Sequence, residues 1–425
     1  MPGPDTQAAE VRALLKQGAV AEADARVGTW LAREARSADA WYLRGVIANL
    51  RRDHAAAIAA LEQALAIRAD SALAWLALGS ALARADAPQK AADAYREAIA
   101  REPGWADAHF NLGVVLKRQG ERAAAMRAMH AAWSRDPLMF DAAKQCVATI
   151  AECVRRGEAH PAPCSAVVVE ARPSFTVVLC SIDDAKKRRA IDLYRRLFAG
   201  YDCDIVAIGN ARSLAQAYNE AAAASSADVI VMSHDDVAIL DPDFAPRVVA
   251  SLARLDIVGV VGSTRMDGPA IGWSGHPHLR GWITHRPPGE AGWQVDVLSP
   301  GPCADGLALL DGVVMATRRA VLRAVPFDAA TFDGFHLYDL DWTYRASRAG
   351  FRLGVAGELL VVHASRGRYG AQWHRHAERF CNKHAAGGAA AAPSSFFGAT
   401  LDTVAEVRAF FATLRALGDE AVASA

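Results

Sequence analysis

The sequence lacks an excess of charge of either sign. Of its 425 residues, 47 are Lys or Arg and 47 are Asp or Glu, so the formal net charge is zero. A chain without a basic surplus has no overall attraction for nucleic acid or for an acidic membrane surface. We therefore expect no nucleic-acid partner, and we expect any chemistry that depends on charge to be local.

Long apolar runs and paired cysteines are also absent. No uninterrupted apolar stretch approaches the roughly 20 residues that span a bilayer, and residues 1–11 lack the basic start and apolar run of a signal peptide. The seven cysteines are odd in number and form no Cys-x-x-Cys pair, which argues against a disulfide framework and a zinc site. We expect a cytoplasmic protein without a membrane span.

What is present begins with a repeat. Gly45, Gly79 and Gly113 recur every 34 residues, and Ala64, Ala98 and Ala132 keep the same period. The spacing resembles that of the tetratricopeptide repeat, a helix pair whose small residues let the two helices approach closely. We predict an α-solenoid of such pairs with a capping helix over residues 5–150.

Stacked helix pairs of this kind form a superhelix with a concave groove. The groove is expected to hold a peptide or a partner protein; the alternative is that the array only packs against the rest of the chain. An asparagine ladder that grips a peptide is not expected, because Leu43 and Ala77 stand where Asn111 stands in the third repeat.

The second half alternates strand-like and helix-like segments. After a linker at residues 151–173, Phe175–Ile182 is a short apolar run typical of a buried strand. A helix from Lys186, a strand from Asp204, a helix from Ser213 and a strand from Asp228 follow. This order predicts an α/β domain at residues 174–385 with a mostly parallel sheet. Residues 386–425 are expected to form a flexible stretch and a short helix.

Carboxylates cluster at three points of this domain. His234-Asp235-Asp236 follows an apolar strand, Asp311-Gly312 precedes another apolar run, and Asp339 and Asp341 lie at a predicted helix start. Mg²⁺ and Mn²⁺ prefer oxygen ligands, and strand ends hold such ligands rigidly at a sheet edge. The pattern suits a divalent-metal phosphate site.

In their order, these motifs resemble those of the GT-A-fold, family-two-like inverting glycosyltransferases. The resemblance implies transfer of a sugar, hexosyltransferase-like, from a nucleoside diphosphate donor, with a UDP-sugar favoured, to a glycan or protein acceptor. It also implies a Mn²⁺ or Mg²⁺ site in which Asp236 and His363 ligate the metal. His234 stands where the family has the first acid of its Asp-x-Asp motif, and is a third candidate ligand.

The same resemblance implies which residues contact the donor and which one is the base. The predicted donor contacts are Ser181, Asp183, Asn210, Asn219, Asp235, Asp311 and Gly312. Direct displacement with inversion needs one general base, and the resemblance gives this role to Asp339, with Asp341 as its near rival. Tyr338 replaces the Glu of the family's Glu-Asp pair.

Two other functions compete with this interpretation. The chain could be a non-catalytic scaffold whose repeats bind proteins and whose second domain only binds a nucleotide, since two acidic positions of the family are replaced. Nucleotidyl transfer is disfavoured, because no Gly-rich loop follows the first strand to hold a triphosphate.

Overall fold

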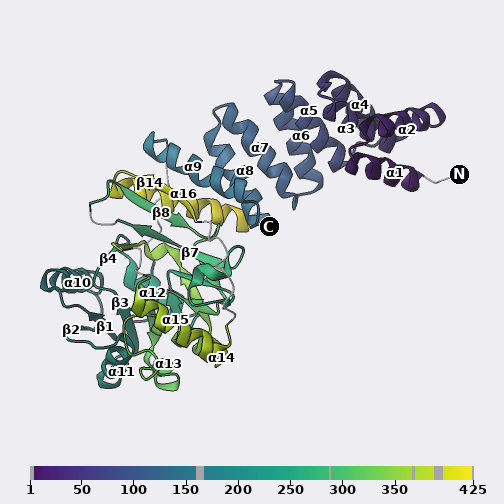
Figure 1. Cartoon of the computed structure of the whole chain (residues 1–425). Coiled ribbons are helices and arrows are strands. Elements are labelled where there is room, and N and C mark those ends of the chain that lie inside the picture. Colours follow the sequence, from purple (N-terminus) through teal and green to yellow (C-terminus); the bar gives the residue numbers. More distant parts are fainter. Residues whose placement is uncertain (1–3, 159–166, 287–288, 366–368, 387–395, 424–425) are drawn as a thin grey trace. The chain divides into compact units, whose positions relative to one another are not determined.

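The computed structural model describes residues 4–158, 167–286, 289–365, 369–386 and 396–423 (Figure 1). The chain divides into two compact units, residues 1–149 and 150–425. Each unit is described by itself below.

The first unit is built of antiparallel helix pairs, coloured purple to blue in Figure 1. Its helices are α1 (Pro4–Lys16), α2 (Val20–Arg33), α3 (Ala38–Leu50), α4 (His54–Ile67), α5 (Ala72–Arg84), α6 (Pro88–Arg101), α7 (Ala106–Arg118), α8 (Arg122–Arg135) and α9 (Phe140–Arg155), which continues into the second unit. The prediction of an α-solenoid is confirmed.

The repeated glycines are the points where paired helices touch. A Cβ added to Gly45 would lie 2.5 Å from Leu61, one on Gly79 would lie 2.6 Å from Tyr95, and one on Gly113 would lie 2.7 Å from Met129. Real Cβ atoms do not approach other atoms this closely. The glycines therefore recur every 34 residues because the paired helices pack too closely at these points for a larger side chain.

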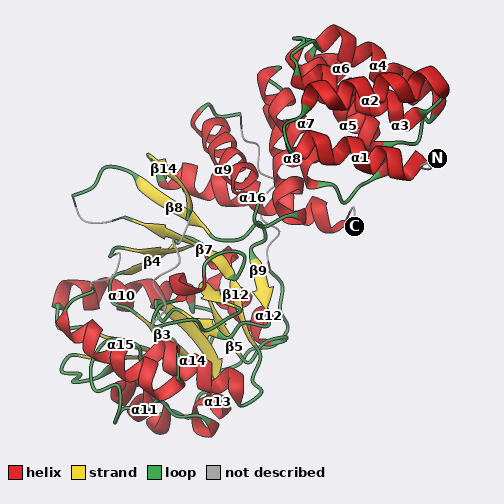
Figure 2. Ribbon diagram, turned by 45° about the vertical axis from the view of Figure 1, so that its right-hand side comes forward, coloured by secondary structure: helices red, strands yellow, loops and turns green. Residues whose placement is uncertain are grey.

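The second unit contains two seven-stranded sheets flanked by helices (Figure 2). The first sheet has the order β2-β1-β3-β11-β5-β12-β9. Its strands are β1 (Phe175–Cys180), β2 (Cys203–Ile208), β3 (Val229–Ser233), β5 (Ile257–Gly259), β9 (Cys303–Asp305), β11 (Val314–Arg318) and β12 (Leu353–Ala356). β1, β2 and β3 run parallel, whereas β11 runs antiparallel to both β3 and β5. The α/β class is confirmed, with a mixed sheet in place of a mostly parallel one.

The second sheet contains β13, whose last residue is His363. Its order is β10-β6-β7-β13-β4, with β8 beside β7 and β14 beside β8. These strands are β4 (Val237–Ile239), β6 (Val261–Ser263), β7 (Leu279–His285), β8 (Trp293–Val297), β10 (Leu309–Leu310), β13 (Val361–His363) and β14 (Phe397–Leu401). β14 was not expected from the sequence, which predicted only a flexible stretch and a short helix after residue 385. In the structure this part of the chain adds an edge strand to the sheet as well as a helix.

Helices pack on both sheets and form two apolar cores. They are α10 (Asp184–Leu197), α11 (Leu214–Ala224), α12 (Phe244–Leu252), α13 (Arg319–Ala324), α14 (Tyr338–Arg348), α15 (Ala371–His384) and α16 (Val404–Ala423), with the short 3-10 helices η1 (Ile271–Ser274) and η2 (Gly357–Leu359). The buried faces of β1, β3 and β11 are almost wholly apolar. Rigid strands therefore carry the polar loops that follow them.

In the part of the chain described, no helix is both long and apolar enough to cross a bilayer.

Candidate active site

The end of β3 meets the end of β13 at a cluster of polar side chains. His234 and Asp236 follow β3, and His363 is the last residue of β13. One ligand atom from each of the three lies within 4.8 Å of the others. The His363 Nε2 atom is 3.3 Å from the His234 Nδ1 atom and 3.3 Å from an Asp236 carboxylate oxygen. The structure thus brings together the three predicted metal ligands.

Two members of this triad, His234 and Asp236, are held in the protonation forms that bind a metal ion. Burial and the neighbouring His363 lower the pKa of His234, which keeps its imidazole neutral. Burial alone would raise the pKa of Asp236, but hydrogen bonding and charge from His363 hold it well below its ordinary value. A neutral imidazole and an ionised carboxylate are the forms that bind metals.

Tyr338 joins the triad to α14. Its hydroxyl lies 3.2 Å from the His234 Nε2 atom, and its ring is buried. In the sequence, Tyr338 stands out only because it replaces the Glu of the family's Glu-Asp pair. In the structure its hydroxyl contacts His234, which replaces the first acid of the family's Asp-x-Asp motif. A single sequence does not reveal that two replaced residues contact each other in the fold.

Asp339 lies in the first turn of α14 and faces the loop that contains Gly312. Its carboxylate accepts a 2.7 Å hydrogen bond from the Gly312 N–H. A Cβ on Gly312 would lie 2.8 Å from Asp339, so glycine is what permits this approach. Burial and the charge of Asp311 raise the pKa of Asp339 to about 7.

Asp311 and Asp235 occupy the edges of the same site. Asp311 follows β10 and accepts a hydrogen bond from the Val313 N–H at 3.0 Å. Asp235 accepts a 2.7 Å hydrogen bond from the Ser181 hydroxyl, at the end of β1, and Lys186 of α10 lies 4.0 Å from its other oxygen. Ser181 and Asp235 therefore meet as expected for loops at one sheet edge.

Three predicted site residues make structural contacts within the protein, whereas the role of a fourth, Asn210, stays a prediction. Asp341 is fully buried and pairs with Arg345, Lys383 and His384, so it ties α14 to α15 and is not placed as a base. The Asn219 amide donates to the Phe327 carbonyl and accepts from the Phe327 N–H, both at 2.9 Å, which makes it a packing residue. The Asp183 carboxylate caps α10. Asn210 is exposed after β2, the edge strand of its sheet.

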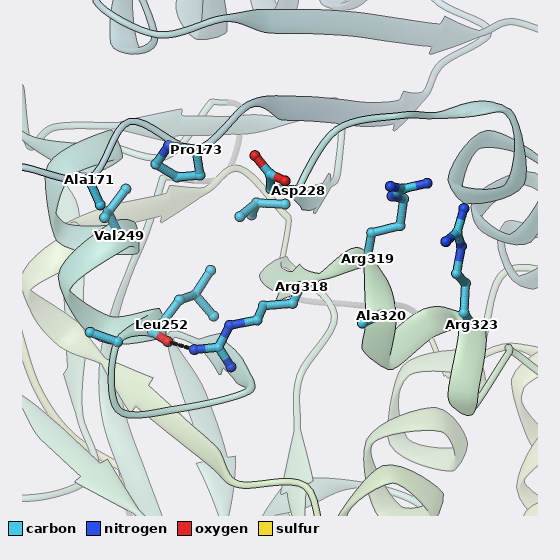
Figure 3. Close-up of a pocket in the computed structure, with 11 residues that line it drawn as sticks. Ala171, Pro173, Asp228, Val249, Leu252, Arg318, Arg319, Ala320 and Arg323 are labelled. Carbon is cyan, nitrogen blue, oxygen red and sulfur yellow. Dashed lines mark hydrogen bonds between the residues drawn. The ribbon is translucent and has the colours of Figure 1, made fainter.

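A cavity of about 430 Å³ lies away from this cluster (Figure 3). It is lined by Asp228 and Val229, where β3 begins, and by Arg318, where β11 ends. Arg319 and Arg323 project side by side from α13, whereas the Arg318 guanidinium turns to the Leu252 carbonyl. Because β3 leads from this cavity to His234, the cavity and the candidate site lie at opposite ends of one strand, and we do not place the chemistry here.

Comparison with known proteins follows this division of the chain. The model of the tetratricopeptide repeat matches residues 8–72, 51–104 and 76–138, and that of the "Glycosyltransferase like family" matches residues 176–385. No curated protein matches the sequence.

Solved structures similar to this chain are tetratricopeptide repeat proteins. A MamA structure is 24% identical over 35% of this chain and 85% of its own, with a TM-score of 0.33. YrrB, described as a TPR protein with an unusual peptide-binding site, is 21% identical over 36% and 79%, with a TM-score of 0.33. The pilF protein of Pseudomonas aeruginosa is 19% identical over 36% and 69%, with a TM-score of 0.34. The chain thus combines tetratricopeptide repeats, within residues 8–138, with a domain of the glycosyltransferase-like family at residues 176–385.

Proposed function

We propose that this protein is a metal-dependent, inverting glycosyltransferase that moves a sugar from a nucleoside diphosphate donor to an acceptor hydroxyl. The observation that carries the proposal is the His234–Asp236–His363 triad, which the Tyr338 hydroxyl links to the helix that bears Asp339, within a domain that matches glycosyltransferases.

The triad fits a divalent cation. Its nearest ligand atoms are 3.3 Å apart. Two ligands of one metal ion lie at a similar separation when each metal–ligand bond is about 2.1 Å long. The His363 Nε2 atom also lies 3.1 Å from the Ser365 hydroxyl. One ring nitrogen makes one good hydrogen bond, so three polar neighbours are more than it needs. Bound there, Mn²⁺ or Mg²⁺ would neutralise charge on the leaving diphosphate.

Asp339 is the proposed base. As the acceptor oxygen bonds to the anomeric carbon of the donor, the bond from that carbon to the diphosphate breaks, and the nucleoside diphosphate leaves with the electron pair. Asp339 takes the proton of the acceptor hydroxyl. A pKa of about 7 lets the carboxylate accept that proton and release it to water near neutral pH.

The donor's nucleoside is proposed to lie over the ends of β1 and β2. Ser181 holds Asp235 in place there, and loops at the carboxyl edge of parallel strands are the usual place for a nucleotide. A UDP-sugar is the favoured donor, and the repeats are proposed to bind the acceptor or a partner protein.

Calorimetry with UDP tests the metal role. We expect UDP to bind at least tenfold more tightly with Mn²⁺ than with a chelator, and His363→Ala to remove that difference. The control is His278→Ala, which alters a histidine that contacts Thr264 and Arg265 instead of the triad. Equal UDP affinity with Mn²⁺ and with chelator in the unaltered protein would refute metal-dependent donor binding.

A further inference from the structure

Three aromatic rings meet at the surface beside the candidate site. The ring centroids of Tyr369 and Trp373 are 4.8 Å apart, and those of Trp273 and Trp373 are 6.0 Å apart. The Tyr369 side chain is 61% exposed, and both tryptophans are only partly buried. Exposed aromatic groups of this size are costly in water, so a contiguous group of them marks a binding surface.

The positions of these rings in the fold place them on one side of the site. Trp273 lies in η1, which follows β6, and Tyr369 and Trp373 follow β13. β6 pairs with β10, which leads into Asp311, and β13 ends at His363. The predicted nucleoside contacts Ser181 and Asn210 follow β1 and β2, which belong to the other sheet.

Two further observations connect the rings with the reacting groups. Tyr369 is six residues from His363, which limits their separation to about 21 Å even for an extended chain. Burial, and then the negative charge of Asp311, raises the pKa of the Tyr369 hydroxyl, as expected for a phenol in electrostatic reach of that carboxylate. The same Asp311 charge acts on Asp339. Trp373 also packs against the apolar core that contains Leu310 and Tyr338, the residues just before Asp311 and Asp339. The rings therefore lie on the side of the site that holds the proposed base.

The chemistry of this surface matches a sugar ring. A pyranose presents a flat C–H face that packs on an aromatic ring, and hydroxyls at its rim that need polar partners. His374 is exposed, and its ring centroid lies 5.2 Å from that of Trp373, so it supplies such a partner. A surface for an apolar peptide would not need polar groups so close to the rings.

From these contacts we infer that Tyr369, Trp373 and Trp273 form a carbohydrate subsite that holds the acceptor against Asp339, so that the acceptor is itself a glycan. The inference rests on the proposed function, since it names the class of acceptor for that reaction.

Saturation-transfer NMR on the full chain, with UDP and Mn²⁺ present, tests the subsite. The probes are free chitotriose, maltotriose, cellotriose and mannotriose. We expect at least one of them to bind, and Tyr369→Ala and Trp373→Ala each to weaken its binding about three- to tenfold, as the loss of one aromatic contact does. Trp373→Tyr, which keeps a ring, should retain most of the affinity.

Phe396→Ala is the matched control, because Phe396 is a 49% exposed aromatic residue outside the three-ring group. UDP affinity and UDP-sugar hydrolysis are measured in parallel. They should be unchanged in Tyr369→Ala, whose exposed side chain is not needed for folding. A loss of UDP affinity or of UDP-sugar hydrolysis in that variant would overturn the inference, since the rings would then hold the donor.

The inference is also wrong if no trisaccharide binds, or if Tyr369→Ala and Trp373→Ala bind as tightly as the unaltered protein. If either of these negative results is obtained while the unaltered protein still binds UDP and hydrolyses a UDP-sugar, only the glycan acceptor is refuted, and the proposed transferase function is not. If neither UDP nor a UDP-sugar binds the unaltered protein, the proposed function itself has failed.

Discussion

At the scale of single residues, two neighbouring aspartates on α14 have opposite environments. Asp339 is buried beside the carboxylate of Asp311 and accepts a hydrogen bond from the Gly312 N–H, and its pKa is raised to about 7. Asp341, two residues later, is held by hydrogen bonds from His384, Lys383 and Arg345, which lower its pKa against the effect of burial. A helix turns about 200° in two residues, so the two carboxylates point to opposite sides.

Asp339→Asn should lower the rate of transfer by about 10²–10⁴-fold while leaving UDP affinity nearly unchanged, because a general base acts on the acceptor's proton. In the unaltered protein, kcat/KM should rise with pH and level off above about pH 7, the pKa of Asp339. Initial rates from pH 5 to 9 measure both effects. A fully active Asp339→Asn variant would contradict the assignment.

The same shift predicts a change in stability. Folding raises the pKa of Asp339 from 3.8 to about 7, so its favourable contribution is present at acid pH and is lost as pH rises through 7. Asp339→Asn removes the buried charge and should therefore raise the melting temperature at pH 8, by an amount equivalent to about 1–3 kcal/mol, but change it little at pH 4. Thermal melts at the two pH values decide this.

At the scale of elements, the Asp341 ion cluster connects α14 with α15. Asp341 pairs with Lys383 at 2.6 Å and with His384 at 2.8 Å, and both belong to α15. Since α15 also carries Trp373, the cluster fixes the helix that supplies part of the proposed acceptor surface.

Asp341→Asn should destabilise the second unit by about 1–3 kcal/mol, because the fully buried carboxylate loses its charge-assisted hydrogen bonds to Arg345, Lys383 and His384. Asp333→Asn is the control: Asp333 also pairs with α15, through His376 and Arg379, but its side chain is 59% exposed, and we expect a loss below about 1 kcal/mol. Urea unfolding of both variants compares the losses. Equal losses would mean that burial of the carboxylate is not what matters.

Helix contacts in the repeats give a second test at this scale. Gly79→Ala should destabilise the first unit by about 1–3 kcal/mol, since the new methyl group would overlap the Tyr95 ring. Gly28→Ala is the matched control, because Gly28 lies inside α2 with nothing within 4 Å of a new Cβ. That variant should gain about 0.5–1 kcal/mol from higher helix propensity. Denaturation followed by circular dichroism should show the opposite signs.

At the scale of the whole molecule, each unit has its own apolar core. The clusters around Leu61, Leu78 and Tyr95 belong to the repeats, and those around Tyr194 and Trp342 belong to the second unit. The predicted catalytic and metal-binding residues all lie in the second unit.

A chain consisting of residues 167–425 should therefore still hydrolyse a UDP-sugar. If the repeats recruit the acceptor, transfer to the natural acceptor should fall about 10²–10⁴-fold, since the fragment loses the high effective concentration that a docked acceptor provides. The packing-only alternative predicts a lower melting temperature or aggregation of the fragment. A stable fragment that transfers sugar at the full-length rate would contradict both roles of the repeats.

The sequence by itself determined the features that recur or that depend on local order. The 34-residue period followed from glycines that fit against Leu61, Tyr95 and Met129, and the strands β1, β2 and β3 followed from short apolar runs. The position of His234 and Asp236 directly after a buried strand predicted a polar site at the sheet edge, and the family resemblance gave them the role of metal ligands. These signals lie within a few residues of one another, or repeat at a fixed spacing, so one chain reveals them.

The tertiary structure decided what depends on partners distant in sequence. Asn219 and Asp341 looked like site residues until Phe327 and α15 were seen to occupy their polar atoms. β11 was found to run antiparallel between β3 and β5, and β14 was found to join the sheet from beyond residue 385. Tyr338 meets His234 across 104 residues of sequence. Hydrogen bonds and burial depend on which groups approach in space, and no local pattern contains that information.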